Sequence, residues 1–253
     1  MGTSLINRYL NLLTSTLLDD IYGSHVAGEQ HWNEGRAGNL ASTLEVDEGQ
    51  YWPERAHTMI GRKRLLNLRT VIERVIADEI PGDLIETGVW RGGASIFIKG
   101  VLAAHGIEDR KVFVADSFAG LPPPDPRYPA DSGDTHTDIN YLRVSKATVA
   151  ENFKRYDLLD ESVVFLEGFF EDTLPNAPIE KLSVLRLDGD MYSSTVQALE
   201  SLYDKVSPGG FVVVDDYALP GCQQAIDEFR ATRDIDAPLN KVDWTGVWWR
   251  LPR

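Results

Sequence analysis

Short apolar runs recur along most of the chain and are separated by longer amphipathic segments. Five such runs are rich in valine, isoleucine, leucine and phenylalanine, and they cover residues 83–88, 111–116, 162–168, 181–188 and 209–216. Runs that are apolar almost throughout are typical of strands buried on both faces of a parallel sheet. The pattern therefore predicts an α/β fold.

Helical spacing of apolar residues appears before and between these runs. The segments that carry it are 5–18, 61–79, 94–106, 146–159, 194–206 and 221–232. Ser193 or Ser194 is a plausible N-cap for the helix at 194–206. Residues 240–251 have the pattern of a hairpin that turns at Thr245 and Gly246. We predict a mostly parallel sheet with helices on both faces and an antiparallel hairpin at its end.

Two segments break this alternation. Residues 23–57 are polar, contain glycine and carry scattered aromatic side chains, so we expect an irregular cap segment or a subunit contact. Residues 119–144 are rich in proline, glycine and aspartate, and a loop of this length is either functional or disordered. We expect it to close over the strand ends as a lid. The predicted organisation is an N-terminal helix and cap at 1–60 and a main domain at 61–253, with the lid at about 119–144.

Acidic residues follow the predicted strands at the points where the strands end. They are Glu86, Asp116, Asp188 with Asp190, and Asp215 with Asp216. The carboxyl ends of parallel strands meet at one edge of a sheet, and ligands of such folds bind there. We therefore expect these acids to share one rim.

The turn at 86–95, with the sequence ETGVWRGGAS, joins the first strand to a helix. Gly88 allows a tight turn, and glycines at 92 and 93 let the backbone approach a ligand at the start of the helix. Asp116, at the end of the next strand, could accept both hydroxyls of a ribose. The alternatives are a plain tight connection for the turn and a cap or solvated aspartate for Asp116. Together the two features favour a nucleoside site.

Asp188, Asp215 and Asp216 bring carboxylate oxygens to the ends of two strands. Hard cations such as Mg²⁺ prefer these ligands. Without compensation the charges would repel one another and be costly to bury. The alternative is that some of them face solvent or pair with Arg186 or Arg91. We predict a divalent metal site.

Asp190 stands two residues beyond Asp188, so a metal does not require it as a further ligand. It is a candidate general base that would take a proton from a hydroxyl whose pKa the metal lowers. Stabilisation of the local turn is the alternative. The histidines are scattered and fit structural or surface positions, except that His136 lies in the predicted lid and is kept as a candidate.

The formal net charge of −14 argues against nucleic-acid and anionic-membrane partners, because both need a basic face. Cys222 is the single cysteine, which excludes an intrachain disulfide and fits a reducing cytoplasm. No stretch is apolar enough to span a membrane, and the N-terminal segment lacks the features of a signal peptide. We expect a cytoplasmic globular protein. The aromatic N-terminal third favours a homo-oligomer.

Several motifs in order resemble the macrocin O-methyltransferase family, over roughly residues 55–250. They read HTMIG, LIETGVWRGGAS, VFVADSFAGLP, FLEGFFEDTLP, LRLDGDMYSST and VSPGGFVVVDDY. Members are Mg²⁺-dependent enzymes that use S-adenosylmethionine to methylate deoxysugar hydroxyls of bacterial natural products. The resemblance implies the Rossmann-like class I methyltransferase fold, with a seven-stranded sheet, and a glycosylated small-molecule acceptor.

The resemblance also implies roles for individual residues. Mg²⁺ would bind Asp188, Asp215 and Asp216, and Asp190 would be the base. The S-adenosylmethionine site would be formed by Thr58, Met59, Glu86, Thr87, Gly88, Val89, Trp90, Ser95, Asp116, Ser117, Phe118, Gly120, Ser145, Gly168, Phe169 and Phe170. The cap segment and the lid are individual to this chain, so the acceptor stays open. Thr245 stands where some relatives carry glutamine.

Three other functions compete with this interpretation. A catechol-type O-methyltransferase would act on another vicinal diol, but its pattern has Asp-Asn where this chain has Asp215 and Asp216. A metal-dependent phosphoesterase would need basic residues to hold phosphate, and few besides Arg91 and Arg186 are expected near the rim. A nucleoside-binding regulatory module would have no need of Asp190.

Overall fold

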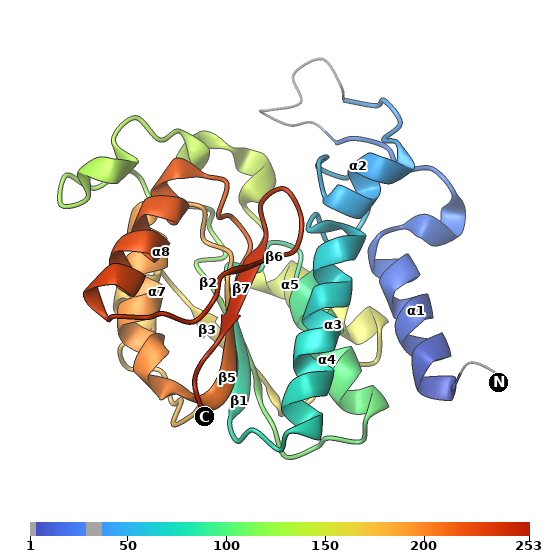
Figure 1. The fold of residues 1–253 in the computed structure, drawn as a ribbon. Helices are drawn as coiled ribbons and strands as arrows, with labels where there is room; N and C mark the ends of the chain where they lie inside the picture. The colour runs from blue at the N-terminus through green and yellow to red at the C-terminus, as the bar shows by residue number, and fades with distance from the viewer. Residues whose placement is uncertain (1–3, 29–36) are drawn as a thin grey trace.

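The computed structural model describes residues 4–28 and 37–253, and in these residues seven strands form one twisted sheet. The order across the sheet is β3-β2-β1-β4-β5-β7-β6 (Figure 1). The strands are β1 (Asp83–Thr87), β2 (Val112–Asp116), β3 (Val163–Glu167), β4 (Leu182–Leu187), β5 (Val206–Val214), β6 (Asn240–Lys241) and β7 (Val247–Arg250). Strands β1 to β5 are parallel, and β7 runs antiparallel to β5 and to β6. The predicted sheet with its terminal antiparallel hairpin is confirmed.

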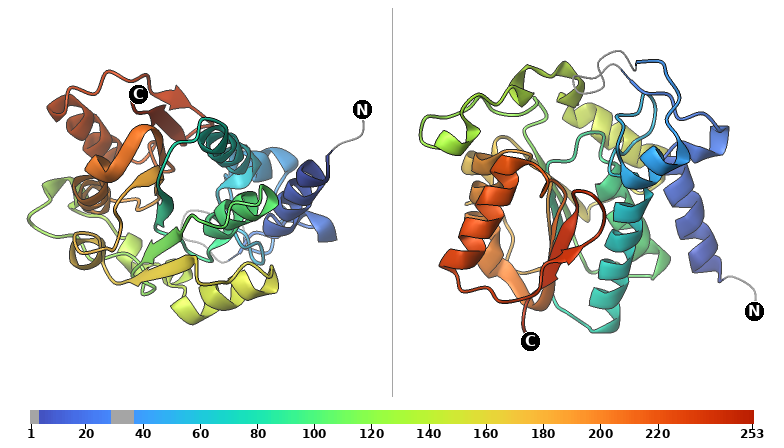
Figure 2. Two further views of the ribbon diagram at one scale, coloured as in Figure 1. Left: turned by 90° about the horizontal axis from the view of Figure 1, so that it is seen from below. Right: turned by 45° about the horizontal axis from the view of Figure 1, so that its top comes forward.

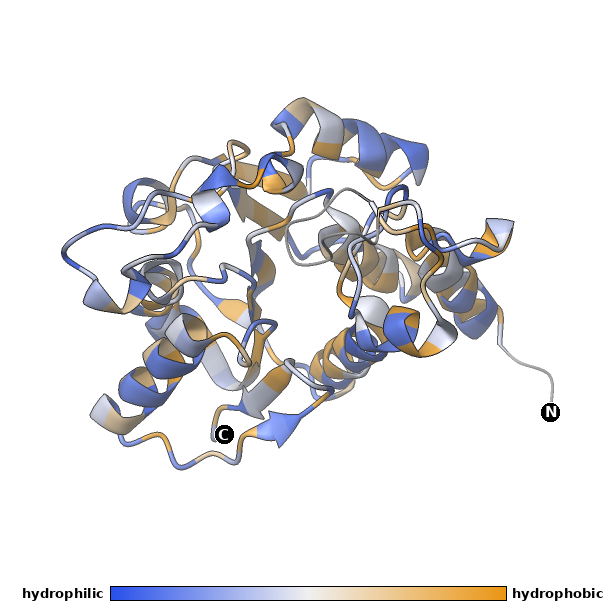
Figure 3. Cartoon of the chain, turned by 90° about the horizontal axis from the view of Figure 1, so that it is seen from above, coloured by the Kyte–Doolittle hydropathy of each residue, from blue (hydrophilic) through white to orange (hydrophobic). Residues whose placement is uncertain are grey.

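Helices cover both faces of the sheet, as the periodicity predicts (Figure 2). One side carries α3 (Gly61–Ala77), α4 (Gly93–Ala104) and α5 (Lys146–Arg155), with α1 (Leu5–Leu17) packed against α4. The other side carries α6 (Phe170–Thr173), α7 (Tyr192–Leu202) and α8 (Pro220–Thr232). The hydrophobic colour follows the strands between these two layers (Figure 3).

Alternation along the strands builds two hydrophobic cores from one sheet. Leu84 of β1 is buried with α3 and α4, whereas its neighbour Ile85 is buried with α7 and α8. Successive strand side chains point to opposite faces, so a strand covered on both sides must be apolar at every position. This is why the strands appear in the sequence as continuous apolar runs.

The cap segment contains a helix that the sequence analysis did not predict, α2 (Thr43–Glu48). Ser42 and Glu45 form a reciprocal capping box at its start, with the Ser42 amide donating to Glu45 Oε2 over 2.8 Å. The Ser-Thr-Leu-Glu spacing was a readable signal for it. The prediction of a wholly irregular segment was wrong here, and its residues 29–36 lie outside the described residues.

Helix α7 is capped differently from the prediction. Its N-cap is Met191, and Ser193 and Ser194 lie inside the first turn. The carboxylate of Asp131, a residue of the lid, accepts hydrogen bonds from the amides of Tyr192 (2.7 Å) and Ser193 (2.9 Å). A carboxylate from a distant loop thus replaces the local serine, and it ties the lid to the start of α7.

The lid follows an irregular path with three single turns of 3-10 helix, at Pro129–Asp131, His136–Asp138 and Asn140–Leu142. Its residues help to enclose a cavity at the carboxyl ends of the strands. The expected position is therefore confirmed, whereas its mobility stays a prediction. Among the described residues, no helix has the length and apolarity needed to cross a bilayer.

Candidate active site

A cavity of about 790 Å³ lies at the carboxyl ends of the strands, beneath the cap segment and the lid. This volume is typical of a small-molecule site. All the strand-end acids line it, as predicted. The predicted site residues in its lining are Thr58, Met59, Glu86, Gly88, Val89, Trp90, Asp116, Ser117, Gly120, Phe169, Phe170, Asp188, Asp190, Asp215 and Asp216.

Five residues predicted for the donor site lie outside this lining: Thr87, Ser95, Phe118, Ser145 and Gly168. Ser95 is buried and its hydroxyl donates to Glu86. The amide of Phe118 donates to the Asp116 carboxylate over 2.7 Å. Ser145 instead caps α5 by accepting from the Thr148 amide at 3.2 Å. Ser95 and Phe118 therefore support cavity residues from behind, whereas the structure gives Ser145 a helix-capping role.

Gly88 occupies the tightest point of the first turn. Its φ is +88°, and a Cβ built on it would stand 1.7 Å from the backbone oxygen of Asp188. Two parallel strands thus pass so closely that their following loops touch through the backbone. This contact holds together the turn after β1, where the methyl donor is expected, and the loop after β4, which carries Asp188 and Asp190.

Replacing Gly88 by alanine is expected to destabilise the protein by more than about 2 kcal/mol, because the added methyl needs both a left-handed backbone and room that the Asp188 carbonyl occupies. Urea unfolding followed by circular dichroism measures the loss. Gly106→Ala is the matched control, since Gly106 also has positive φ (+66°) but open space around it. Equal losses for the two variants would show that the close approach has no energetic weight.

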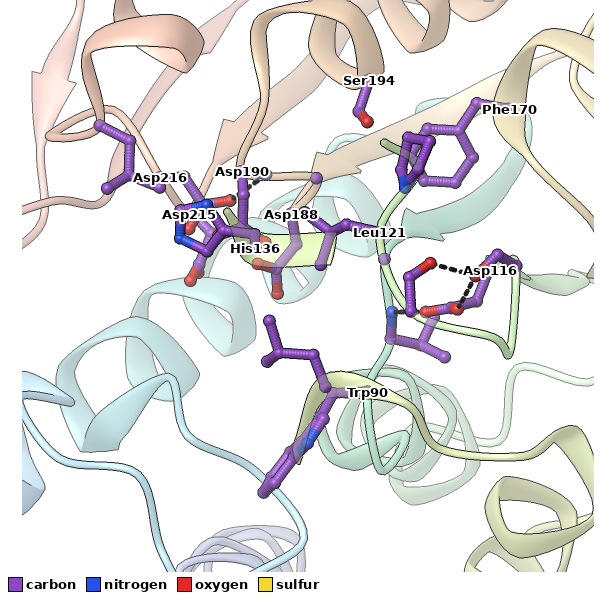
Figure 4. A pocket seen from close by; sticks show the side chains of 18 of the residues that line it. Trp90, Asp116, Leu121, His136, Phe170, Asp188, Asp190, Ser194, Asp215 and Asp216 are labelled. Carbon is purple, nitrogen blue, oxygen red and sulfur yellow. Dashed lines mark hydrogen bonds between the residues drawn. The ribbon is translucent and has the colours of Figure 1, made fainter. Parts of the chain in front are cut away.

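Asp116 is fixed by the turns on either side of it. Its two carboxylate oxygens accept from the amides of Val89 (2.8 Å) and Phe118 (2.7 Å). Figure 4 shows the Asp116 side chain in the cavity wall. Burial raises its pKa, and the amide bonds act in the opposite direction. A carboxylate oxygen has more than one lone pair, so Asp116 can hold these amides and still accept from a ligand.

Asp188, Asp215 and Asp216 converge as predicted, with one oxygen of each lying within 4.8 Å of the others. Burial raises the pKa of Asp188 and of Asp216, and the neighbouring carboxylates raise both further. Three hard oxygen donors that repel one another fit a divalent cation such as Mg²⁺, which would relieve that repulsion. The donor set is therefore suited to the predicted metal.

Two buried arginines balance part of this negative charge. Arg186, on β4, pairs with Glu86 (2.5 Å), with Asp188 (2.6 Å) and with Asp215. Arg64, on α3, pairs with the other oxygen of Asp215 and with Asp243 of the hairpin turn. Asp188 and Asp215 therefore do pair with Arg186, which the sequence left open as an alternative to metal binding. Each carboxylate still has free lone pairs that could bind a cation.

Glu86 lies one residue before the end of β1 and is buried behind the acidic trio. Burial raises its pKa to about 8, the charges of Asp188 and Asp215 add to the rise, and Arg186 and Ser95 oppose it. A carboxyl group of this kind can hold a proton at neutral pH and then donate as well as accept a hydrogen bond.

Asp190 differs from its neighbours. Its backbone has φ +58°, its amide donates to Asp216 over 3.1 Å, and within the described residues its carboxylate has no hydrogen-bond partner. Burial, followed by the charge of Asp188, raises its pKa to about 7. A left-handed backbone at a non-glycine residue is uncommon and is often found at functional sites. The loop therefore presents an unengaged carboxylate to the cavity (Figure 4).

The cap segment, the donor turn and the lid meet in an aromatic cluster at the cavity wall. Trp52 stacks on Tyr141 with ring centroids 5.3 Å apart, and the indole of Trp90 donates to the Tyr141 carbonyl over 3.0 Å. The guanidinium of Arg91 lies 4.2 Å from the Trp90 ring and donates to the Ala56 carbonyl over 2.8 Å. The cap segment and the lid are thereby both fixed to the turn that follows β1.

Arg64, Asp131 and Asp243 are site-supporting residues that the sequence analysis missed. Arg64 looks like an ordinary polar position of an amphipathic helix, and its partner Asp215 is 151 residues away. Asp131 lies in a segment without periodicity. Nothing local in the sequence marks any of these pairings, because each depends on how distant segments meet.

Residues 6–251 match the family described as macrocin-O-methyltransferase (TylF). The chain belongs to this family. It is therefore an O-methyltransferase, and its sheet is that of the class I, S-adenosylmethionine-dependent methyltransferases. The resemblance of the quoted motifs is confirmed, and the cavity at the strand ends is the candidate active site of a family member.

Two relatives and one solved structure show how close the similarity is. Demethyldecarbamoylnovobiocin O-methyltransferase of Streptomyces niveus is 53% identical over 97% of this chain and 94% of its own length. Mycinamicin III 3''-O-methyltransferase of Micromonospora griseorubida is 45% identical over 97% of this chain and 96% of its own length. The structure of the O-methyltransferase NovP has a TM-score of 0.88 and 45% identity, and the match covers 98% of this chain and 100% of that one.

Proposed function

We propose that this O-methyltransferase moves the methyl group of S-adenosylmethionine to a hydroxyl of a deoxysugar on a bacterial natural product, with Mg²⁺ at Asp188, Asp215 and Asp216 and with Asp190 as the general base. One observation carries the proposal. A single cavity contains the glycine-rich donor turn, the acidic trio and an aspartate whose carboxylate is unengaged.

The choice of acceptor is supported by the relatives. Their names specify O-methylation of demethyldecarbamoylnovobiocin, of mycinamicin III and of a rhamnosyl tetracenomycin C, the last by a Streptomyces olivaceus enzyme that is 51% identical over 80% of this chain. These are bacterial natural products, which places this chain by similarity in antibiotic biosynthesis.

The donor is assigned to the end of the cavity near Asp116. Residues of the turn after β1 line the cavity, where their backbone would meet a ligand, and the Asp116 carboxylate lines the same space. Phe169 and Phe170 supply apolar surface beside it. This arrangement suits a nucleoside whose ribose hydroxyls bond to Asp116 while its base packs on aromatic carbon.

The chemistry follows from the positions of the acids. Asp188, Asp215 and Asp216 would hold the Mg²⁺, which when bound would lower the pKa of the acceptor hydroxyl and fix its position. Asp190 accepts the hydroxyl proton while the oxygen attacks the methyl carbon, and the carbon–sulfur bond breaks toward sulfur. Asp188, Asp215 and Asp216 hold their oxygens around one point, and Arg186 and Arg64 keep the first two of these carboxylates in place.

The competing functions fit the cavity less well. A phosphoesterase needs unpaired arginine or lysine side chains, but in the described lining Arg64 is bound by Asp215 and Asp243, and Arg127 by Asp125 and Glu171. A purely regulatory nucleoside module gives no reason for an unengaged, half-buried Asp190 that faces the cavity. A catechol-type reaction remains the nearest rival, and the substrates named for the relatives favour the sugar.

Replacing Asp116 by alanine is expected to weaken S-adenosylmethionine binding by about tenfold or more, since each hydrogen bond to a charged acceptor contributes roughly 1.5–3 kcal/mol. Isothermal titration calorimetry with S-adenosylmethionine, S-adenosylhomocysteine, NAD and ATP measures the loss and tests the donor class together. Glu167→Ala is the control. Glu167 of β3 lies in register with Asp116 of β2, but it is exposed and outside the cavity. An unchanged dissociation constant in the Asp116 variant would remove Asp116 from the donor site.

The location and assembly of the protein stay predictions. Its acidic charge and single cysteine favour the cytoplasm and argue against nucleic-acid or membrane partners. A homo-oligomer through the cap segment is expected from the aromatic residues there. Size-exclusion chromatography with light scattering would contradict this expectation by giving the mass of one chain.

A further inference from the structure

The middle of the lid is fastened to the loop that carries Asp190. Asp131 is 3% exposed, and its carboxylate accepts from the amides of Tyr192 and Ser193, which begin α7 immediately after the Asp190 loop. The amide of Asp134 in turn donates to the Asp131 carbonyl over 3.0 Å. Because a buried charged acceptor is costly to leave unpaired, this part of the lid and the Asp190 loop form one unit.

His136 is the side chain that this unit presents to the cavity. Its amide and its Nδ1 both bond to the Asp134 carboxylate, at 2.8 Å each, so the ring cannot turn freely. The same residue lines the main cavity and a second one of about 210 Å³ under the lid, and Asp190 lines both as well. His136 and Asp190 therefore stand together in the wall between the two cavities, and Figure 4 shows them beside each other.

The His136 ring differs from the arginines of the site in having one nitrogen, Nε2, without a partner among the described residues. In the described lining, Arg64 and Arg127 are each held by two carboxylates, whereas His136 Nε2 has no partner. His57 also lines the cavity, but burial lowers its pKa to about 4 and leaves it neutral. The Asp134 carboxylate raises the pKa of His136, which favours a ring that carries a proton on Nε2.

We propose that His136 is a substrate-contacting residue of the methyl-transfer reaction, whose Nε2 donates a hydrogen bond to an oxygen of the acceptor and holds it against Asp190. This role rests on the proposed function. A sugar offers several oxygens that accept hydrogen bonds, and the acids of the rim can supply few donors to them. His136 supplies such a donor, Asp134 orients it, and Asp131 fixes its distance from the Asp190 loop.

Two substitutions at His136 distinguish a hydrogen bond from Nε2 to the acceptor from a purely structural role of the side chain. His136→Asn keeps an amide that can bond to Asp134 but has no group at the position of Nε2. His136→Gln places its amide nitrogen near that position. The acceptor KM is expected to rise about ten- to a hundredfold in the first variant, as for the loss of one charged hydrogen bond, and to stay within about threefold of wild type in the second. Calorimetric affinity for S-adenosylmethionine should be unchanged in both.

The kinetic measurement uses demethyldecarbamoylnovobiocin and mycinamicin III as trial acceptors. His105→Asn is the matched control, because His105 pairs with Glu73 at the outer end of α4, away from the cavity. An unchanged acceptor KM in His136→Asn, equal losses in both His136 variants, or a parallel loss of donor affinity would each overturn the assignment. Failure of the wild type to methylate any glycoside would instead contradict the proposed function.

The placement of His136 can be tested without an acceptor. In Asp131→Ala, amide hydrogen exchange of residues 129–138 and 188–194 is expected to accelerate at least about tenfold, with a smaller rise in Asp131→Asn, which keeps one acceptor oxygen. Arg127→Gln removes an exposed lid contact to Glu171 and should leave these segments unchanged. Wild-type exchange rates in Asp131→Ala would show that the anchor does not hold His136 beside Asp190, and the proposal would fall.

Discussion

Asp190→Asn is expected to lower turnover by about 10²–10⁴-fold, the range for loss of a general base, while donor affinity and metal requirement stay near wild type. The substitution preserves the size of the side chain and removes its capacity to take a proton. It also suits the backbone, because asparagine, like aspartate, tolerates the φ of +58° found there. The loss should therefore be chemical and not conformational.

Asp157→Asn is the control for this experiment. Asp157 has nearly the same backbone, with φ +56°, but it is exposed in a turn after α5 and outside the cavity. Turnover of that variant should match the wild type. If Asp190→Asn kept wild-type turnover at saturating Mg²⁺, the base would have to be another group, with His136 the first to examine, and the central proton-transfer step would be wrong.

Removal of divalent metal by a chelator is expected to reduce turnover by about 10²-fold or more, because the metal contributes several kcal/mol of charge stabilisation in reactions of this kind. Added Mg²⁺ should restore it. Asp188→Asn and Asp216→Asn should each raise the Mg²⁺ concentration needed for half-maximal activity by about tenfold or more. Direct calorimetric titration of each variant with Mg²⁺ gives a second readout that does not depend on turnover.

Asp215→Asn is a less clean variant for the metal site. Asp215 is buried and paired with Arg186 and Arg64, so its loss also takes one anionic partner from each of two buried cations. Its effect should therefore combine weaker metal binding with lower stability. Asp172→Asn, at an exposed position of α6, is the neutral control. Full activity in the presence of excess chelator would remove the metal from the mechanism.

The sheet and its rim could be predicted because both depend on local pattern and strand direction. Apolar runs marked the strands, and parallel strands must end at one edge, so the convergence of Asp188 and Asp215 followed from topology alone. Burial on both faces explains why the signal was strong: Leu84 and Ile85 each had to be apolar, although they face opposite cores.

The supports of the site could not be predicted in the same way. Arg64 reaches Asp215 across 151 positions, and Asp131 displaces the serines that would be the local choice of cap for α7. Such pairings depend on how the lid, the cap segment and the hairpin fold back over the sheet. Ser145 was expected at the donor site, and the structure shows a local role for it as the N-cap of α5, while its part in donor binding stays a prediction.

The most direct test of the account is methyl transfer from methyl-labelled S-adenosylmethionine to a glycosylated natural product. The purified protein is incubated with demethyldecarbamoylnovobiocin or mycinamicin III, with and without chelator, and the product is analysed by mass spectrometry and NMR. We predict a labelled methyl ether on a sugar oxygen, lost with chelator and regained with Mg²⁺. A labelled aglycone, label transfer that the chelator does not affect, or no transfer to any glycoside would contradict the account.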